Sequence, residues 1–402
     1  MQIRNSRKES IMSQIYDNFV HSSDYNGLPL SNLCSSSDEE AFRNIIELVQ
    51  EETVQVLSQS HVENPHIIQF GFMPKDEQIR CLQENETVCL YPSSSYLKKH
   101  RDVSDYSLKP FDKMMALGYP QLKACYFKYD ILSKYAFDSR MNMNFSDYSG
   151  SIKSNDDVDD NNYINLDTFG IGRQNETIVI VSYPRYLRNM STSNQFQWYG
   201  YLINDDTDCK TLEDYNKNLF SGSWAFPNTV YQSILQEMHN INELTKIAFE
   251  KELFSHEYSK DELQRFDMLS FPSLDCYNQF LLLLEKVVIS NIDINFLKLV
   301  IKTTDKDGKQ LGALACLKKF ITKVNIDCVD KIYKPLHSVR RERQAPAHKI
   351  EHDRYSYDFL QKQHQMCCDI YKSLNRLRLL FESHPKVKGY SVKYPNTQYL
   401  EI

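Results

Sequence analysis

The sequence lacks any apolar run long enough to cross a membrane. Its most apolar stretch, residues 280–289, contains both Glu285 and Lys286, whereas a membrane-spanning helix needs about 20 consecutive apolar residues. The first ten residues are polar and lead into no apolar segment of the kind found in signal peptides. We therefore expect a cytoplasmic protein with no membrane partner.

Glycine and proline are also scarce, with 11 and 13 residues in a chain of 402. Neither the phosphate-binding pattern G-x-x-x-x-G-K-[ST] nor the nucleophile elbow G-x-S-x-G occurs. Gly170 and Gly172 lack the third glycine of a dinucleotide fingerprint, so we interpret residues 169–173 as a turn. These absences disfavour a doubly wound or glycine-looped phosphate-binding fold, and we expect neither a cofactor nor a metal.

The ten cysteines form no C-x-x-C pair. This spacing is typical of reduced, mostly buried thiols, and it disfavours a zinc ribbon or a disulfide framework. Cys367 and Cys368 are adjacent within a segment of helical pattern. We interpret them as core or interface residues rather than as nucleophiles.

The length and the apolar pattern predict two domains of an α+β protein. Residues 1–225 carry short alternating runs separated by turns, which predict a mixed domain with a mainly antiparallel sheet. Residues 226–402 carry apolar residues at 3–4 spacing, which predicts an all-α helical bundle. The helices are expected at 229–255, 274–290, 308–324 and 355–383.

Within the first domain, we expect the polar residues 1–35 to be loose. Ser37 and Glu40 form a capping-box pattern, which predicts a helix whose apolar face reaches Val56 and Leu57. The remaining predictions are strands near 67–72, 87–91, 125–131 and 177–182, a solvated acidic loop over 151–162, and core positions for Trp198 and Trp224.

Charge is segregated along the chain. Residues 331–402 contain 14 Lys and Arg against 7 Asp and Glu, although the whole chain has a net charge of −6. A site for phosphate is therefore expected at the C-terminal end. The alternative, left open by charge alone, is that this basic part docks on the acidic part, within one chain or between two.

The densest group of reactive side chains lies in residues 336–354, LHSVRRERQAPAHKIEHDR. Arg343 and His348 form an R-x4-H pattern there, and Arg340 and Arg341 precede it. An imidazole near neutrality can remove the proton of a ribose 2′-hydroxyl or protonate a leaving 5′-oxygen. A guanidinium can bind the phosphate with two hydrogen bonds. This chemistry suits RNA cleavage without a metal.

A helical C-terminal unit with R-x4-H resembles the HEPN superfamily, in which an R-x4–6-H motif marks metal-independent ribonucleases. The run 343–349 is similar to the form found in bacterial HEPN domains, and the two-domain layout resembles ApeA-like defence proteins. The resemblance implies an endoribonuclease of toxin or antiphage defence. It also implies a homodimer in which two motifs face one cleft.

Carried over by position, Arg343 would bind the phosphate and His348 would be the general acid and base. Supporting RNA contacts are expected from Arg340, Arg341, Lys349 and Tyr355. The family often has Asn, Asp or His where this chain has Gln344, and Pro346 argues against an unbroken helix through the motif. Arg341 and His348 also satisfy R-x6-H, so the choice of arginine stays open.

Three alternatives remain. His348, Glu351 and His352 form H-x-x-E-H, a zinc-hydrolase pattern that needs a third ligand, for which Glu382 is the candidate. The second alternative is that residues 340–354 are a solvated basic connection, in which His348 only caps a helix or packs on its neighbour. Finally, the domain could be a non-catalytic HEPN-like module that binds RNA or a regulatory partner protein.

Overall fold

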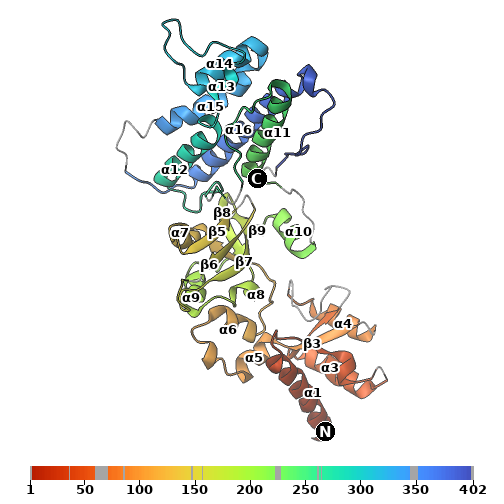
Figure 1. Cartoon of the computed structure of the whole chain (residues 1–402). Coiled ribbons are helices and arrows are strands. Elements are labelled where there is room, and N and C mark those ends of the chain that lie inside the picture. Colours follow the sequence, from red (N-terminus) through yellow and green to blue (C-terminus); the bar gives the residue numbers. More distant parts are fainter. Residues whose placement is uncertain are drawn as a thin grey trace. The chain divides into compact units, whose positions relative to one another are not determined.

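The computed structural model describes residues 2–35, 37–58, 71–84, 87–145, 148–155, 157–221, 228–259, 262–263, 265–344 and 352–399 (Figure 1). The chain forms two compact units, Met1–Met143 with Gly150–Leu212 and Asn144–Ser149 with Glu213–Ile402. The expected boundary at residue 225 falls on 222–227, outside the described residues. Helices together with antiparallel sheets confirm the α+β class.

The helices of the first unit are α1 (Gln2–His21), α2 (Leu30–Leu33), α3 (Glu39–Gln50), α4 (Lys75–Gln83), α5 (Ser94–His100), α6 (Pro110–Ala116), α7 (Ser133–Ala136), α8 (Pro184–Leu187) and α9 (Thr192–Gly200). The strands are β1 (Leu28–Pro29), β2 (Val54–Ser58), β3 (Val88–Pro92), β4 (Cys125–Lys128), β5 (Met141–Phe145), β6 (Ser149–Ser154), β7 (Asn165–Gln174), β8 (Thr177–Ser182) and β9 (Cys209–Thr211).

Helix α1 corrects the expectation that the first 35 residues are loose. Its side chains Ile11, Ile15 and Phe19 follow a four-residue spacing and are almost fully buried. They lie against α3 and the small sheet β1-β3-β2 (Figure 1). Because the other faces of the helix are polar, the average composition of this segment resembles that of a loop. Burial of an apolar stripe nevertheless stabilises a helix.

Helix α3 is shorter than predicted. Asp38, rather than Ser37, caps it by accepting a hydrogen bond from the Ala41 N–H at 3.1 Å. The helix ends before Glu52, which has a left-handed φ of 58°. Val56 and Leu57 therefore belong to β2, which pairs antiparallel with β3. The alternating β-branched residues after the break favour a strand.

The larger sheet has the order β4-β8-β7-β6-β5, and β9 pairs with β7. The strands predicted at 87–91 and 177–182 correspond to β3 and β8, whereas the run 125–131 is a strand only as far as Lys128. The strand predicted at 67–72 is not found at 71–72, and 59–70 lie outside the described residues.

The glycines at 170 and 172 lie inside β7, so the predicted turn is wrong. A Cβ atom at Gly172 would stand 2.7 Å from the Lys210 carbonyl oxygen of β9. Glycine is thus needed because two backbones approach closely, rather than because the chain turns.

Trp198 is fully buried, as predicted, and its Nε1 donates to the Tyr135 hydroxyl at 3.0 Å. Trp224 lies outside the described residues. The acidic segment 151–162 is part strand, because β6 extends to Ser154. After that strand, Asp159 accepts hydrogen bonds from the N–H groups of Asn161 and Asn162, which is the bonding of a turn.

The second unit contains α10 (Glu213–Ser221), α11 (Val230–Phe249), α12 (Leu274–Leu284), a π-helical turn (Glu285–Ile289), α13 (Ile294–Leu297), α14 (Ala313–Val324), α15 (Val329–Gln344) and α16 (Asp358–Glu382). Helix α16 packs against α11 and α15, and α15 also packs against α12 and α14 (Figure 1). The core of the second unit includes the buried side chains of Ile234, Leu281, Leu317, Leu336 and Leu374.

Helix α15 is not among the helices predicted from the sequence. Its buried residues Ile332, Leu336 and Val339 form one stripe, although Pro335 lies inside the helix. The helix ends at Gln344, two residues before Pro346. The first motif residues are therefore held on a packed helix.

No helix in the described part of the chain is long and apolar enough to cross a membrane. All ten cysteines lie in that part, and none of them forms a disulfide there. Cys367 and Cys368 are buried in α16, as expected of core residues.

Candidate functional site at the end of helix α15

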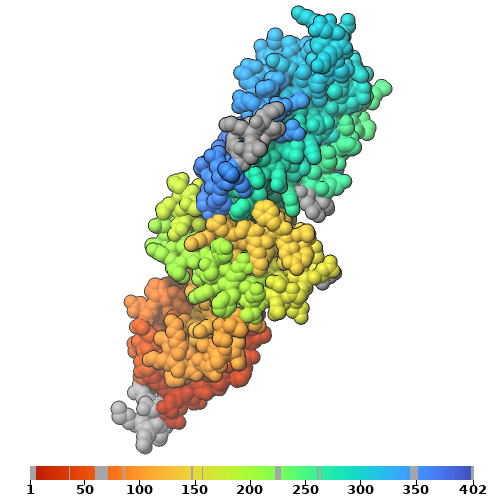
Figure 2. All heavy atoms as spheres, turned by 90° about the vertical axis from the view of Figure 1, so that its left-hand side faces the viewer, coloured from red at the N-terminus to blue at the C-terminus, as the bar shows by residue number. Residues whose placement is uncertain are grey.

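The last turn of α15 carries Arg340, Arg341 and Arg343. Arg341 and Arg343 are exposed, while Arg340 is half-buried beside Gly312, at the start of α14. Figure 2 shows the face of the second unit that lies on the left in Figure 1, where the α15 label stands. His348 and Lys349 lie outside the described residues. The structure thus locates the arginines of the predicted site on a helix end.

A hydrogen bond from a tyrosine of α12 helps to hold this turn. The Tyr277 Oη donates a hydrogen bond of 2.8 Å to the Glu342 Oε2. Tyr277 is 5% exposed and also packs against Phe359. Burial, together with the Glu342 carboxylate, raises the pKa of the phenol well above its usual range, so that the hydroxyl remains a donor.

The chain that follows the motif is attached to the same end of α12. The Asp353 carboxylate accepts from the Asp275 N–H at 3.0 Å, and the Arg354 carbonyl accepts from the Leu274 N–H at 3.0 Å. Ser273 and Tyr355 form an antiparallel bridge. These hydrogen bonds hold residues 353–355 against the first turn of α12.

Residues on both sides of the segment 345–351 are therefore fixed to one helix end. Glu342 is held by Tyr277, and Asp353 is held by Asp275, only two positions earlier on α12. His348 lies midway in the sequence between these anchors.

The two candidate arginines lie on different faces of α15. Two residues correspond to about 200° around an α-helix, so Arg341 and Arg343 point in nearly opposite directions. Arg343 continues the stripe of Leu336 and Val339, which faces the core. Arg343 therefore points along the core-facing side of α15, although its own side chain is exposed at the end of the helix.

Tyr355, the predicted stacking residue, is 40% exposed. Its ring lies 5.4 Å from that of Phe271 and 5.5 Å from that of Tyr357. The neighbouring Arg354 lies 5.7 Å from the centre of the Phe359 ring. Aromatic and cationic side chains therefore surround the anchored segment.

Glu382, the candidate third ligand of the H-x-x-E-H zinc alternative, lies too far from the motif. Glu382 forms an ion pair with Arg378 at the far end of α16, which has 25 residues. That length corresponds to about 37 Å, and His352 precedes the opposite end of this helix. Glu382 and His352 therefore cannot bind one ion, and no group of three metal-ligand side chains is found among the described residues.

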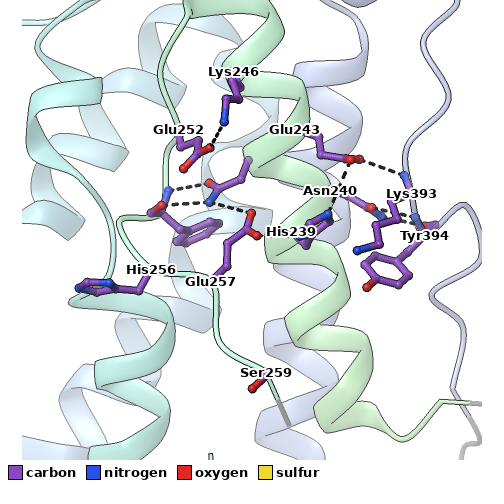
Figure 3. Close-up of polar contacts among 12 residues, drawn as sticks. His239, Asn240, Glu243, Lys246, Glu252, His256, Glu257, Ser259, Lys393 and Tyr394 are labelled. Carbon is purple, nitrogen blue, oxygen red and sulfur yellow. Dashed lines mark hydrogen bonds and ion pairs between the residues drawn. The ribbon is translucent and has the colours of Figure 1, made fainter. Parts of the chain in front are cut away.

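A second cluster, on α11, was missed by the sequence analysis (Figure 3). His239 Nδ1 lies 3.0 Å from Glu257 Oε2, and His239 Nε2 lies 3.6 Å from Glu243 Oε1. The His239 ring also contacts Tyr394. The His256 side chain points away from this group (Figure 3). An imidazole between two carboxylates can form an ion pair with either when protonated.

The surrounding contacts assign this cluster a structural role. Asn240 binds both backbone groups of Tyr394, at 2.8 and 3.1 Å, and Asn242 binds both backbone groups of Phe254, at 3.0 and 2.8 Å (Figure 3). The cluster thus ties two non-helical segments to α11. A polar residue inside an otherwise apolar helical stripe is the sequence signal that could have revealed it.

A third feature is basic. A hollow of about 490 Å³ is lined by Lys298, Lys302, Lys319 and Lys323 together with residues 299–301. Two of these ammonium groups donate to backbone carbonyls, Lys319 to Thr304 and Lys323 to Val300. The hollow contains none of the predicted site residues.

Comparison with protein-family models, with curated proteins and with solved structures finds no match for this chain.

Proposed function

We propose that the protein is a metal-independent endoribonuclease with a HEPN-like helical domain, in which Arg343 binds the scissile phosphate and His348 transfers protons. The observation that supports this most is the double anchoring on α12. Tyr277 holds the turn that carries Arg343, and Asp275 holds the chain after the motif. A site for proton transfer needs such fixed supports.

In the proposed reaction, His348 removes the proton of a ribose 2′-hydroxyl, and the 2′-oxygen attacks the adjacent phosphorus. The bond from phosphorus to the 5′-oxygen breaks, and an imidazolium protonates that oxygen. The products are a 2′,3′-cyclic phosphate and a 5′-hydroxyl, so no water is consumed in this step. Arg343 stabilises the charge that builds on the phosphate oxygens.

The proposal includes a homodimer, in which the motifs of two chains face one cleft, and a role in toxin or antiphage defence within the cytoplasm. Two motifs in one cleft would let one histidine act as base while the other acts as acid. The first unit would then recognise a trigger or select the substrate, and a regulatory partner protein could restrain the nuclease.

The test is to incubate the full chain with total cellular RNA in EDTA and to map the new ends. Wild type is compared with His348→Ala and with His352→Ala, a matched control at an exposed histidine four residues later. We expect cyclic-phosphate ends with wild type and with His352→Ala, and none with His348→Ala.

Cleavage by all three proteins would contradict the assignment of His348. Loss of activity in both variants, with dependence on added zinc, would instead support the H-x-x-E-H alternative. RNA binding without cleavage by the wild type would support the non-catalytic module.

A further inference from the structure

Helix α15 presents a line of rings and cations on its outer face. Tyr333, His337 and Arg341 follow one another at intervals of four residues, so they lie along one side of the helix. His337 and Arg341 are exposed, and Tyr333 is half-buried. Their spacing of eight residues corresponds to about 12 Å along the axis.

The members of this line contact one another. The rings of Tyr333 and His337 are 5.3 Å apart at an angle of 30°. The Lys318 Nζ of α14 lies 4.7 Å from the centre of the Tyr333 ring. Two neighbouring helices thus contribute to one surface, which we name the α15 track: Lys318, Tyr333, His337 and Arg341.

The charge of the α15 track is not neutralised by nearby acids. Among the described residues, no carboxylate forms an ion pair with Lys318 or Arg341. Asp330 is paired with Lys334 at 2.7 Å, and Glu342 accepts from Tyr277. In the part of the chain that the structure describes, the α15 track therefore combines two cations that form no ion pair with two aromatic rings.

We propose that the α15 track binds a single strand of RNA and leads it to the end of the helix. This inference rests on the proposed function for its ligand. A base can stack on the exposed His337 ring, because base–aromatic stacking is independent of sequence. Lys318 and Arg341 then bind the flanking phosphates. A length of about 12 Å accommodates about three stacked nucleotides at 3.4 Å each.

The position of the α15 track explains how it serves the site. Arg341 and Arg343 belong to the same turn of α15. A strand held along the outer face therefore reaches the turn that carries Arg343. Because the two arginines point in nearly opposite directions, the strand would pass around the end of α15 to meet Arg343. Lys318, Tyr333 and His337 are not among the site residues predicted from the sequence, whereas Arg341 is. In this proposal Arg341 holds the RNA strand and does not act on the scissile phosphate.

The test measures RNA binding separately from cleavage. The parent is the full chain with His348→Ala, in EDTA, and the probe is an unstructured fluorescein-labelled oligoribonucleotide of mixed sequence followed by anisotropy. We expect Tyr333→Ala and His337→Ala each to weaken binding about tenfold, and Tyr333→Phe to bind as the parent does. Tyr390→Ala, at a tyrosine that is 45% exposed outside the track, is the matched control.

The charged members have their own readout. Lys318→Ala should lower the slope of log affinity against log salt by about 0.7, the value for one phosphate contact on a single strand. Unaltered affinity in Tyr333→Ala and His337→Ala, or no binding by the parent, would overturn the track. If the α15 track binds RNA but the wild type does not cleave it, only the proposed nuclease function is refuted. If the wild type cleaves RNA but the track variants bind it as the parent does, only the role of the α15 track is refuted.

Discussion

Glu237 of α11 and Arg378 of α16 form an ion pair inside the second unit, with Oε2 and Nε 2.8 Å apart and side-chain exposures of 0% and 13%. Burial alone would lower the pKa of Arg378, but the carboxylates of Glu237 and Glu382 outweigh it, so the guanidinium stays charged. Glu237 also accepts from Asn375 and Thr397. This carboxylate therefore joins α11, α16 and the C-terminal segment.

The first prediction concerns this pair. Glu237→Ala should lower the free energy of unfolding by about 3–5 kcal/mol, because a buried guanidinium loses its main counter-ion. Replacing both partners by leucine should cost less than the single change. Urea unfolding followed by circular dichroism measures both.

The exposed pair Lys246–Glu252 provides the control, because its side chains are 70% and 39% exposed. Glu252→Ala should cost less than about 1 kcal/mol. Equal effects of Glu237→Ala and Glu252→Ala would show that the buried pair does not hold the helices together.

The second prediction concerns β7. Gly172→Ala should destabilise the larger sheet by about 1–3 kcal/mol, because its Cβ would collide with the Lys210 carbonyl and separate β9 from β7. Gly200→Ala is the matched control, since no atom lies within 4 Å of the Cβ that it adds. Thermal unfolding of the two variants should give a lower midpoint for Gly172→Ala only.

The case of Gly172 also shows how far the sequence could predict the fold. Strand β8 was evident because nearly all of its residues are β-branched. The glycines of β7 interrupt such a pattern, and their purpose depends on β9, some 38 residues later in the chain. Long-range backbone contacts of this kind leave no local signal. Helix α1 was missed for a different reason, since its buried stripe is thin and its other faces are polar.

For the candidate site at the end of α15, the sequence predicted the types of the reactive residues but not the helix and the contacts that hold them. Arg343 and His348 were found from spacing and charge, yet α15 was not, because Pro335 and many charged residues hide its apolar stripe. The anchors Tyr277 and Asp275 lie about 65 and 78 residues from their partners. Such contacts are decided by helix packing and cannot be read from a motif.

The third prediction concerns alkaline pH. Burial raises the pKa of Cys125 from 9.0 to about 12 and that of Cys89 from 9.0 to about 11. The folded state holds these protons more tightly than the unfolded state, so the thiols contribute stability that is complete below pH 9. That stability is lost as the pH rises toward the folded-state values.

Thermal midpoints measured from pH 8 to 11 should therefore fall above pH 9. The double variant Cys89→Ala and Cys125→Ala should show a shallower fall than wild type, although its midpoint at pH 8 is lower. A parallel fall in both proteins would show that other groups, such as the buried tyrosines, carry the pH dependence.

The fourth prediction concerns the anchor of α15. Tyr277→Phe removes one hydroxyl and leaves the Glu342 carboxylate without its donor. We expect a loss of about 1–2 kcal/mol in the free energy of unfolding and a lower kcat for RNA cleavage, with RNA affinity unaltered. Glu342→Gln, which keeps an acceptor for the hydroxyl, should retain more activity than Tyr277→Phe. The reverse order would mean that the bond does not position Arg343.

The last prediction separates the two arginines of the motif. Arg343 continues the core-facing stripe of α15, and Arg341 lies on the outer face with Tyr333 and His337. Arg343→Ala should lower kcat for RNA cleavage by at least about a hundredfold, with little change in RNA affinity. Arg343→Lys should restore little, because an ammonium cannot form two parallel hydrogen bonds to a phosphate.

Arg341→Ala should do the opposite, raising KM several-fold while kcat is retained, because it removes a contact made equally to bound RNA and to the transition state. Steady-state cleavage of a labelled RNA by the three variants measures both constants. If Arg341→Ala lowers kcat and Arg343→Ala does not, then the catalytic pair is the R-x6-H pair of Arg341 and His348. In that case the catalytic face of α15 is its outer face, because two residues reverse the direction of a side chain on a helix.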